Sequence, residues 1–284
     1  MLVGPTGAGK SALALEIAET FGATIVSMDA MQVYRGFDIG TAKAGLAERG
    51  RVPHACIDIR NPDELFSAAD FVHEAETVDR LGTPTLLVGG TTFYLRAWLF
   101  GLVEAPPIDP GVRAGFEALD DPHSALLLVD PLLASRLHAH DRMRIVRGLE
   151  VHALTGRRLS EMHDADPWQR RDAEVVCVDA SDLYERIDRR VDAMMAAGYL
   201  GEVEGILAAG WSRACKPMQS LGYRHIAAHL SGETDLDEAV RRTKRDTRHF
   251  ARKQRGFLRS WGIKAGPDAA SDAIAAAARA FART

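Results

Sequence analysis

The stretch that decides the fold of this chain lies at residues 4–11 and reads Gly4-Pro5-Thr6-Gly7-Ala8-Gly9-Lys10-Ser11. It fits the phosphate-binding loop pattern GxxxxGK(S/T) without a gap. Glycines let successive backbone N–H groups point inward at phosphate oxygens, the lysine adds a positive charge, and the serine hydroxyl is suited to hold Mg²⁺. The Ala/Leu-rich run that follows, to Phe21, predicts a helix whose N-terminus also favours an anion. The sequence therefore predicts a loop that holds a diphosphate or the phosphate tail of a nucleotide.

Length and composition exclude several classes of protein. The chain has 284 residues, of which 46% are hydrophobic, enough for one large domain or for a core with a smaller domain. No apolar run approaches the roughly 18 residues that a membrane span needs. The cysteines, Cys56, Cys177 and Cys215, have no metal-ligand spacing and are typical of reduced thiols, so we expect a cytoplasmic protein. The net charge of −4 excludes a chain that is basic throughout, but it allows a local basic face.

Short apolar runs alternate with amphipathic ones along most of the chain. The expected strands lie at residues 1–3, 23–28, 53–60, 86–88 and 175–178. The strand before Gly4 is expected to be short, because only three residues precede that glycine. The expected helices between the later strands and beyond them lie at 67–81, 182–195 and 198–210. This order predicts an α/β fold with a P-loop-type parallel sheet flanked by helices.

Polar residues follow two of the expected strands. Asp29 comes directly after the run at 23–28, and Thr91 follows Gly89-Gly90 after the run at 86–88. Ligands bind open α/β sheets at the carboxyl ends of the strands, so both side chains are expected to line the site, although Gly89-Gly90-Thr91 taken alone is better explained as a plain turn from strand to helix with Thr91 as the cap. The glycine-containing segment 36–43 is expected to form a loop over the site. There Lys43 either reaches phosphate or is a solvated surface charge.

An all-helical domain is expected to interrupt this α/β core. Residues 104–110 (EAPPIDP) carry three prolines and indicate a boundary. We expect a catalytic core at 1–108 and 173–284 and a helical insertion at 109–172. The expected helices of the insertion lie at 111–119, 131–139, 141–154 and 157–163, while residues 126–129 are its longest β-rich run.

One long helix is expected at residues 237–261, with two neighbouring stripes. The first is a largely apolar seam of Val240, Thr243, Thr247, Phe250, Gln254, Phe257 and Trp261. The second consists of Arg241, Arg245, Arg248, Arg252, Arg255 and Arg259. Six arginines on one face are typical of a surface that binds a polyanion, and an exposed helix laced with charges is the alternative.

Six motifs, in this order, resemble the tRNA dimethylallyltransferases, also called tRNA isopentenyltransferases, over nearly the whole chain. They are the loop at 4–11, Asp29-Ala30-Met31-Gln32-Val33-Tyr34, Asp38-Ile39-Gly40-Thr41-Ala42-Lys43, Val88-Gly89-Gly90-Thr91, Met143-Arg144-Ile145-Val146-Arg147-Gly148-Leu149-Glu150-Val151 and Leu221-Gly222-Tyr223-Arg224. The resemblance implies that the N6 amine of the adenosine immediately 3′ of the anticodon attacks C1 of dimethylallyl diphosphate, and that pyrophosphate leaves. It implies Asp29 as general base, with Thr91 and Lys10 as further catalytic residues.

The resemblance also implies two sets of binding residues. The diphosphate, with Mg²⁺ held by Ser11, would contact Gly4, Pro5, Thr6, Gly7, Ala8, Gly9, Lys10, Ser11 and Arg224. The tRNA anticodon stem-loop would contact Asp29, Ala30, Met31, Gln32, Arg113, Met143, Arg144, Ile145, Val146, Arg147, Gln219, Gly222, Tyr223, Arg224, Arg245 and Arg248. Gln219 stands where some members of the family have an arginine. A monomer without membrane partners is expected.

Three other functions fit parts of the sequence. An adenylate isopentenyltransferase would share the loop and the donor, but it has little need of the insertion or of the arginine stripe. A P-loop kinase for a small molecule would use ATP, with Asp29 holding Mg²⁺ and the insertion serving as a lid. A non-catalytic RNA-binding module leaves the phosphate loop and Asp29 without a role.

Overall fold

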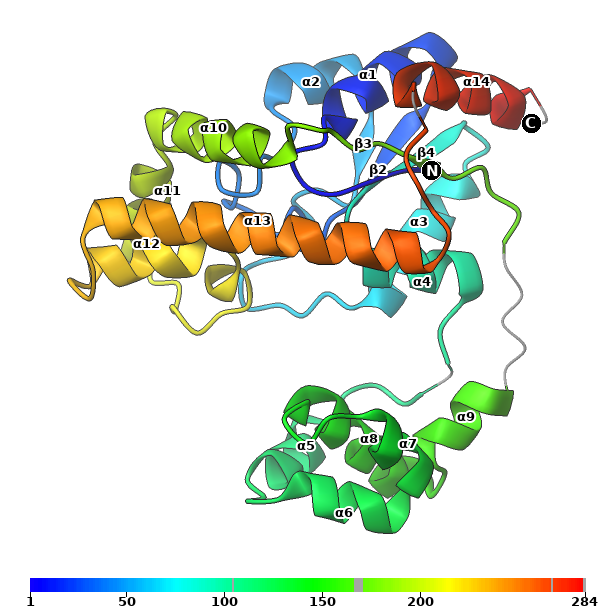
Figure 1. Cartoon of the computed structure of the whole chain (residues 1–284), viewed down its shortest axis with the longest axis vertical. Helices are drawn as coiled ribbons and strands as arrows, with labels where there is room; N and C mark the ends of the chain where they lie inside the picture. The colour runs from blue at the N-terminus through cyan, green and yellow to red at the C-terminus, as the bar shows by residue number, and fades with distance from the viewer. Residues whose placement is uncertain (104, 166–170, 267, 283–284) are drawn as a thin grey trace. The chain divides into compact units, whose positions relative to one another are not determined.

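The computed structural model describes residues 1–103, 105–165, 171–266 and 268–282. The chain divides into two compact units (Figure 1). The α/β unit comprises Met1–Leu99 and Arg171–Thr284, and the helical unit comprises Phe100–Arg170. The helical unit begins earlier than the expected boundary at 109, because Val103 and Ala105 pack against its core.

The α/β unit contains a five-stranded parallel sheet in the order β3-β2-β4-β1-β5, which confirms the expected fold class. Its strands are β1 (Leu2–Val3), β2 (Thr24–Met28), β3 (His54–Ala55), β4 (Thr85–Gly89) and β5 (Val176–Cys177). Strand β3 is the short strand expected within residues 53–60, and it ends after Ala55. The cause is local: Cys56 and Asp58 have φ angles of 60° and 55°, which the extended backbone of a strand does not allow.

Helices cover both faces of this sheet. Because side chains alternate along a strand, Ile25, Leu86 and Val88 face one side, where they share a core with α1 (Lys10–Phe21) and α14 (Ala269–Phe281). Figure 1 shows α1 and α14 together on that side, with α3 (Ala68–Asp79) and α4 (Thr92–Phe100) on the other. A short helix, α2 (Leu46–Arg51), follows the loop after β2, and the sequence pattern did not predict it. The sheet is therefore buried on both faces, as parallel sheets require.

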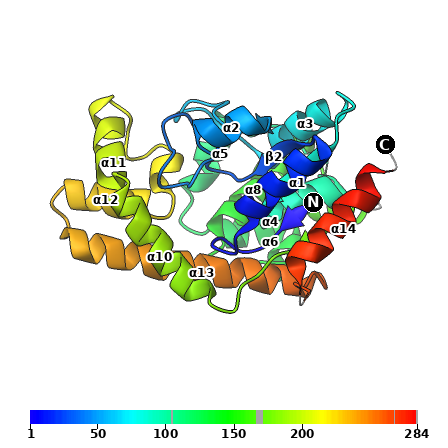
Figure 2. The same cartoon turned by 90° about the horizontal axis from the view of Figure 1, so that it is seen from above.

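A second group of helices lies beyond the carboxyl ends of the strands. It consists of α10 (Leu183–Ala196), α11 (Tyr199–Ala208), the 3₁₀ turn η1 (Pro217–Gln219), α12 (Tyr223–Leu230) and α13 (Leu236–Ser260). Helix α13 runs alongside both α10 and α12 (Figures 1 and 2).

The apolar seam expected on α13 is partly wrong. The helix buries Ala239, Thr243, Ala251, Gln254 and Leu258. Phe250 is 41% exposed, and its neighbour Ala251 is buried instead. Phe257 and Trp261 pack on each other, with ring centroids 4.5 Å apart.

The helical unit is built from α5 (Pro110–Glu117), α6 (Pro122–Val129), α7 (Pro131–Arg136), α8 (Arg142–Thr155) and α9 (Leu159–Ala165). Its core centres on Leu126, Ile145 and Leu149. The first three helices each begin with an aspartate cap followed by a proline, as at Asp121-Pro122. Helix α6 was not predicted, and residues 126–129 are its last turn.

The chain leaves the α/β unit for the helical unit and returns to it at one place. The backbone N–H of Arg171 donates to the carbonyl of Leu99, 2.7 Å away. The guanidinium of Arg171 lies over the ring of Trp98, 4.3 Å from its centroid, and pairs with Glu76. The two ends of the α/β unit that border the insertion are thus fastened to each other.

Candidate active site

The phosphate-binding loop connects β1 to α1 through backbone conformations that only glycine adopts readily. Gly7 and Gly9 have φ angles of 83° and 94°. Gly4 lies so close to the carbonyl of Val178 that a Cβ would overlap it. Lys10, the first residue of α1, donates to the carbonyl oxygens of Gly4, at 2.9 Å, and Pro5, at 2.8 Å. Lys10 is thereby held against the loop that precedes it.

Two cations stand at this loop. Burial and the neighbouring Arg190 lower the pKa of Lys10 to about 8, so its amine is still protonated at neutral pH. The Arg190 guanidinium, from α10, lies 3.3 Å from Thr6 Oγ1 and 3.5 Å from the Thr41 carbonyl. Burial lowers the pKa of Arg190, and the negative charge of Asp29 opposes that shift. Two partly buried positive charges so close together favour a ligand with more than one negative charge.

Asp29 and Thr91 lie at the ends of neighbouring strands. Met28 of β2 pairs with Gly89 of β4, so the residues that follow each strand emerge side by side. Asp29 Oδ1 accepts the N–H of Met31, at 2.8 Å, and Thr91 Oγ1 accepts the N–H of Ala30, at 3.3 Å. Within the described residues, the second oxygen of Asp29 accepts no hydrogen bond. It is therefore available to a ligand.

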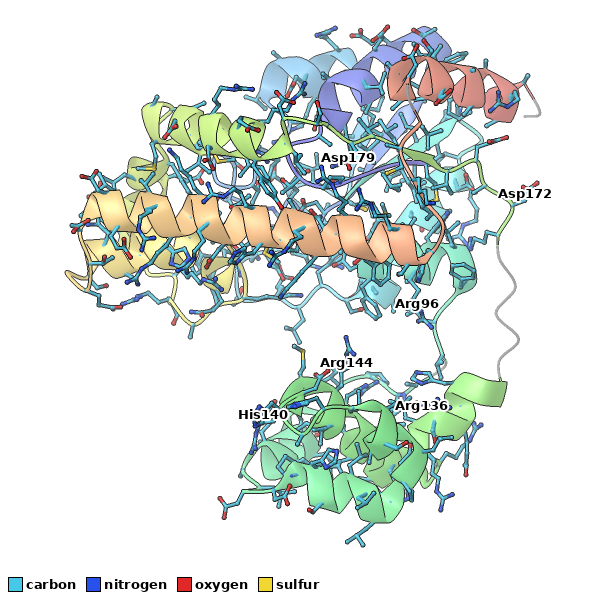
Figure 3. All side chains as sticks on the ribbon, viewed as in Figure 1. Arg96, Arg136, His140, Arg144, Asp172 and Asp179 are labelled. Carbon is cyan, nitrogen blue, oxygen red and sulfur yellow. The ribbon has the colours of Figure 1, made fainter. Side chains whose placement is uncertain are left out.

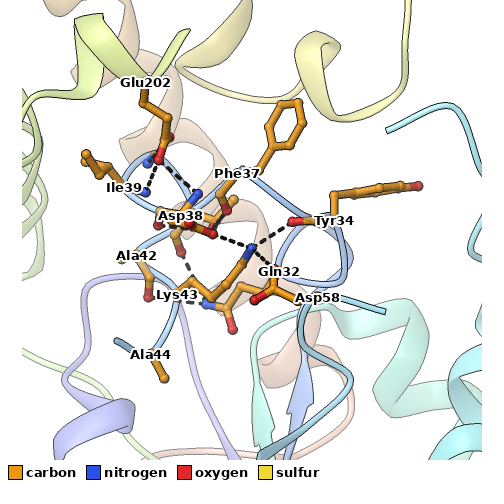
Figure 4. A network of polar contacts seen from close by, with 12 residues as sticks. Gln32, Tyr34, Phe37, Asp38, Ile39, Ala42, Lys43, Ala44, Asp58 and Glu202 are labelled. Carbon is orange, nitrogen blue, oxygen red and sulfur yellow. Dashed lines mark hydrogen bonds and ion pairs between the residues drawn. The ribbon is translucent and has the colours of Figure 1, made fainter. Parts of the chain in front are cut away.

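The loop at 36–43 is held from two sides (Figure 4). Lys43 is fully buried, and its Nζ lies 2.6 Å from Asp38 Oδ1, 2.6 Å from Asp58 Oδ1 and 2.7 Å from the Tyr34 carbonyl. Lys43 is therefore neither a phosphate ligand nor a solvated surface charge, because its ammonium group pairs with residues that hold the loop in place. From the other side, the Glu202 carboxylate accepts the backbone N–H groups of Asp38, Ile39 and Gly40 at 3.0, 2.6 and 3.2 Å.

These elements surround one pocket of about 800 Å³ in the α/β unit, a volume typical of small-molecule sites. Its lining includes Lys10, Ser11, Asp29, Thr91 and Arg190. Ala30, Met31, Gln32, Gln219 and Arg224 also line it, as do His249, Phe250 and Lys253 of α13. The pocket therefore joins a cationic phosphate loop, an available carboxylate and an outer group of basic and aromatic side chains.

Residues of the Gly222-Tyr223-Arg224 turn have separate structural roles. Arg224 pairs with Asp246 at 2.6 Å. Tyr223 is wholly buried and donates its hydroxyl to Glu202, so its side chain does not offer the surface to RNA that the sequence had suggested. Gly222 has a φ of 83°, and a Cβ there would lie 2.6 Å from the Tyr199 hydroxyl.

Four of the six arginines in the α13 stripe pair with carboxylates of the chain itself. The pairs are Arg241 with Glu238, Arg245 with Asp246, Arg248 with Asp188 and Arg255 with Asp179, the last of which is labelled in Figure 3. Much of the positive charge of this face is therefore already balanced.

In the helical unit, the motif at 143–147 consists of two exposed residues, two buried residues and one of intermediate exposure. Met143 and Arg144 are 72% and 74% exposed, and Figure 3 shows Arg144 projecting from its helix. Ile145 and Val146 are buried, so the expectation that they contact RNA is wrong: their side chains pack inside the helical unit and offer no surface to a partner.

The two other arginines named in this unit share one buried carboxylate. Arg147 pairs with Glu150 at 2.7 Å, and Arg113 lies 3.8 Å from the same residue. Glu150 also accepts the N–H of Asp109, the cap of α5. Both arginines therefore help to hold the unit together.

The sequence profile of the IPP transferase family matches residues 32–261, and that of the isopentenyl transferases matches residues 1–58. The chain belongs to the IPP transferase family. Two relatives of this family member are the tRNA dimethylallyltransferases of Geobacter metallireducens and, under the name tRNA dimethylallyltransferase 1, of Citrifermentans bemidjiense. The Geobacter metallireducens protein is 46% identical over 90% of this chain and 87% of its own length. The Citrifermentans bemidjiense protein is 46% identical over 89% of this chain and 86% of its own length.

Solved structures extend the likeness to this IPP transferase. A tRNA isopentenylpyrophosphate transferase from Staphylococcus epidermidis is 30% identical over 93% of this chain and 90% of its own, with a TM-score of 0.66. A eukaryotic dimethylallyltransferase, described as acting on tRNA, is 26% identical over 90% of this chain and 68% of its own, with a TM-score of 0.79. In the described part of the chain, no helix is long and apolar enough to cross a membrane.

Two residues of the site were not predicted from the sequence. Arg190 was one of several charged residues in its helix, yet it follows Leu183 by seven positions and Ile187 by three, so it falls on the buried face. That position was the available signal. Gln254 was placed in an apolar seam, although a buried amide needs polar partners.

Proposed function

We propose that this chain is a monomeric, cytoplasmic tRNA dimethylallyltransferase. It transfers the dimethylallyl group of dimethylallyl diphosphate to N6 of the adenosine immediately 3′ of the anticodon and releases pyrophosphate. The observation that carries the proposal is a single pocket lined both by a phosphate loop with two cations, Lys10 and Arg190, and by Asp29. The names of the relatives support the same activity.

The phosphate loop suits a leaving pyrophosphate. As the C1–O bond of the donor breaks, its electron pair and the negative charge pass to the diphosphate. Backbone N–H groups of the loop, the positive end of α1, Lys10 and Arg190 would stabilise that charge. Groups that the fold holds before the donor binds lower the barrier of the transfer itself.

Asp29 suits the proton transfer at the acceptor. The N6 lone pair forms the new bond to C1, and the proton that N6 must lose passes to the carboxylate oxygen of Asp29 that accepts no hydrogen bond from the described residues. The hydrogen bonds from Met31 to Asp29 Oδ1 and from Ala30 to Thr91 Oγ1 orient this group. Thr91 thereby acts as the residue that couples the β4 end to Asp29.

The donor set also fits a divalent cation. Ser11 offers a hydroxyl at the first turn of α1, in the pocket that Asp29 lines. Within the described residues, no group of three or more His, Cys, Asp or Glu side chains could hold a metal unaided. Mg²⁺ commonly takes few protein oxygens and completes its shell with substrate phosphates and water. Held by Ser11, it would supply further neutralisation of the diphosphate charge.

For the RNA, the proposed contacts are the exposed or pocket-lining members of the predicted set. They are Ala30, Met31, Gln32, Met143, Arg144, Gln219, Arg224 and Arg245. Arg248 does not meet this criterion, because its side chain is only partly exposed and pairs with Asp188. The target adenine must leave its stack to enter the pocket, which costs least in a single-stranded loop such as the anticodon.

The test offers radiolabelled dimethylallyl diphosphate and Mg²⁺ to the purified protein with either unmodified tRNA or AMP. Label in the adenosine next to the anticodon is the expected result. Label in AMP alone would make the protein an adenylate isopentenyltransferase. Absence of label from both acceptors, accompanied by phosphoryl transfer from ATP, would replace the proposal with a kinase.

A further inference from the structure

Gln254 of α13 joins two loops of the pocket that are far apart in the sequence. Its Oε1 accepts the backbone N–H of Thr6 in the phosphate loop, at 2.9 Å. Its Nε2 donates to the carbonyl of Gly90, directly after β4, at 2.7 Å. These partners lie 248 and 164 positions away along the chain, and the Gln254 side chain is buried.

The absence of a side chain at Gly90 is a second, independent sign of this arrangement. A Cβ built on Gly90 would overlap Gln254 Nε2 and would lie 2.9 Å from the Gly4 carbonyl. The φ angle of Gly90 is not in the left-handed region, so close packing, not backbone conformation, accounts for a glycine here. The phosphate loop, the end of β4 and the Gln254 amide are thus packed as one block.

This block continues to the proposed base. Thr91 follows Gly90 and accepts the N–H of Ala30, and Ala30 follows Asp29. One series of contacts therefore runs from Thr6, through Gln254 and Gly90, to Thr91 and the Asp29 segment. A primary amide is the side chain that accepts at one end and donates at the other, as these two partners require.

We infer that Gln254 is a positioning residue for the transfer reaction, an inference that rests on the proposed function. It sets the separation between the loop that holds the diphosphate and the strand ends that hold Asp29 and Thr91. Alkyl transfer requires C1 of the donor to meet the acceptor nitrogen in line with the leaving oxygen. A misplacement of about 1 Å between the two halves of a site can cost roughly 100-fold in rate.

The test compares Gln254→Leu, Gly90→Ala and the double variant in the labelled transfer assay. Gln254→Leu removes both hydrogen bonds of the amide, and the added Cβ of Gly90→Ala would displace the same amide from the Gly90 carbonyl. Both changes therefore break the Gln254–Gly90 hydrogen bond, and each is expected to lower kcat by roughly 30- to 100-fold, while KM for dimethylallyl diphosphate changes by less than about threefold. The kcat of the double variant should lie within about twofold of the kcat of the slower single variant, because the same hydrogen bond cannot be broken twice. Independent effects would multiply to about 1,000-fold or more, and that result would overturn the inference.

Gln254→Glu adds a readout that a merely structural role would not produce. A protonated carboxylic acid accepts and donates in the pattern of the amide, whereas the carboxylate cannot donate to Gly90. Burial favours the neutral acid, while Lys10, Arg190 and Lys253, which line the same pocket, favour the carboxylate and Asp29 opposes it. Relative to wild type, kcat of Gln254→Glu should rise about tenfold from about pH 8 to about pH 5, and Gln254→Leu should stay flat. A flat ratio for both would overturn the inference.

Two controls keep the outcomes apart. Ile17→Val removes a buried methyl group from the same unit outside the pocket and should lower the melting temperature without changing kcat. A normal kcat for Gln254→Leu, beside an active wild type, rejects the positioning role and leaves the proposed function intact. A wild type that transfers no label rejects the proposed function. In that case, the affinity of Gln254→Leu for inorganic pyrophosphate is compared with that of wild type, and the stability of the Gln254→Leu/Gly90→Ala double variant is compared with that of the single variants. An unchanged affinity, together with stability losses that simply add in the double variant, rejects the shared hydrogen bond as well.

Discussion

Tyr223 donates its buried hydroxyl to the Glu202 carboxylate, 2.5 Å away, and the same carboxylate holds the backbone of the loop over the pocket at residues 38–40. One acidic side chain on α11 thus connects α12 to the motif that begins at Asp38. Such a carboxylate is well satisfied, and its removal would leave four donors without their partner.

Glu202→Ala should lower the free energy of unfolding by about 2 kcal/mol, because hydrogen bonds to a charged group contribute more than neutral ones. Urea unfolding measures the loss. Glu204 is the matched control, since it lies on the exposed side of the same helix, and Glu204→Ala should change stability by less than about 0.5 kcal/mol. Equal losses for the two variants would contradict the role given to Glu202.

Lys43→Met should reduce the loss in the free energy of unfolding that occurs when the pH falls into the acid range. Burial alone would raise the pKa of Asp58, but hydrogen bonds from Lys43 and Arg49 outweigh it and leave the pKa below its ordinary value of 3.8. A lowered carboxyl pKa stabilises the fold above about pH 4, and this stability is lost as the pH falls through the folded-state pKa. The gap in unfolding free energy between wild type and Lys43→Met should therefore be wider at about pH 6 than at about pH 3. A constant gap would mean that the Lys43–Asp58 pair is not linked to folding.

The lowered pKa of Lys10 predicts that the affinity for the donor depends on pH in the alkaline range. Burial, followed by the charge of Arg190, lowers its pKa to about 8, so affinity for dimethylallyl diphosphate should fall as the pH rises through that value. Arg190→Met weakens binding at neutral pH, and it also removes one cause of the shift, so the midpoint of the fall should move to higher pH. Isothermal titration with inorganic pyrophosphate measures both effects, and an unmoved midpoint would assign the titration to another group.

Asp29→Asn should lower kcat by roughly 100- to 10,000-fold, the usual contribution of a general base. The amide keeps an oxygen for the Met31 N–H, so the local fold is preserved. The dissociation constant for tRNA should change by less than about twofold, as a filter-binding assay would show. Parallel loss of both would remove Asp29 from the role of base.

Arg144→Gln should flatten the dependence of tRNA binding on salt. Removing one charge that neutralises a phosphate should reduce the slope of log K against log salt by about 0.7–0.9. Arg142, two positions earlier on the same helix, donates to the carbonyls of Glu117 and Leu119 and so is tied to its own unit. Arg142→Gln is the control and should leave the slope unchanged. The same slope for both variants would remove Arg144 from the RNA contacts.

The sequence predicted the parts of the site that depend on local pattern. The phosphate loop owes its form to glycines within eight residues, and Asp29 and Thr91 follow directly from the ends of their strands. By contrast, Arg190 meets Thr6 across 184 positions, and which side of α10 faces the loop depends on how the helix packs. The spacing along α10 places Arg190 on the buried face, but it does not say which distant segment that face contacts. The buried pairing of Lys43 was also missed. Its partner Asp58 has a left-handed backbone, which the apolar pattern at 53–60 does not indicate.

In the helical unit, helix α6 was missed although a local signal for it was present. Residues 126–129 were noted only as the longest β-rich run of the insertion, and no helix was expected there. However, Asp121-Pro122 begins a helix, since aspartate caps the first N–H groups and proline fits the first turn. The cap signal at the start of a segment was more informative than the apolar residues at its end.

The hydrogen bond between Arg171 and Leu99 holds together the two ends of the insertion, so the helical unit is, in topological terms, one long loop of the α/β unit whose ends are already closed. Since the cost of closing a loop grows only with the logarithm of its length, lengthening or shortening that loop changes the stability of the α/β unit very little. Replacing the helical unit by a shorter or longer insertion at this junction should accordingly leave the melting temperature of the α/β unit nearly unchanged.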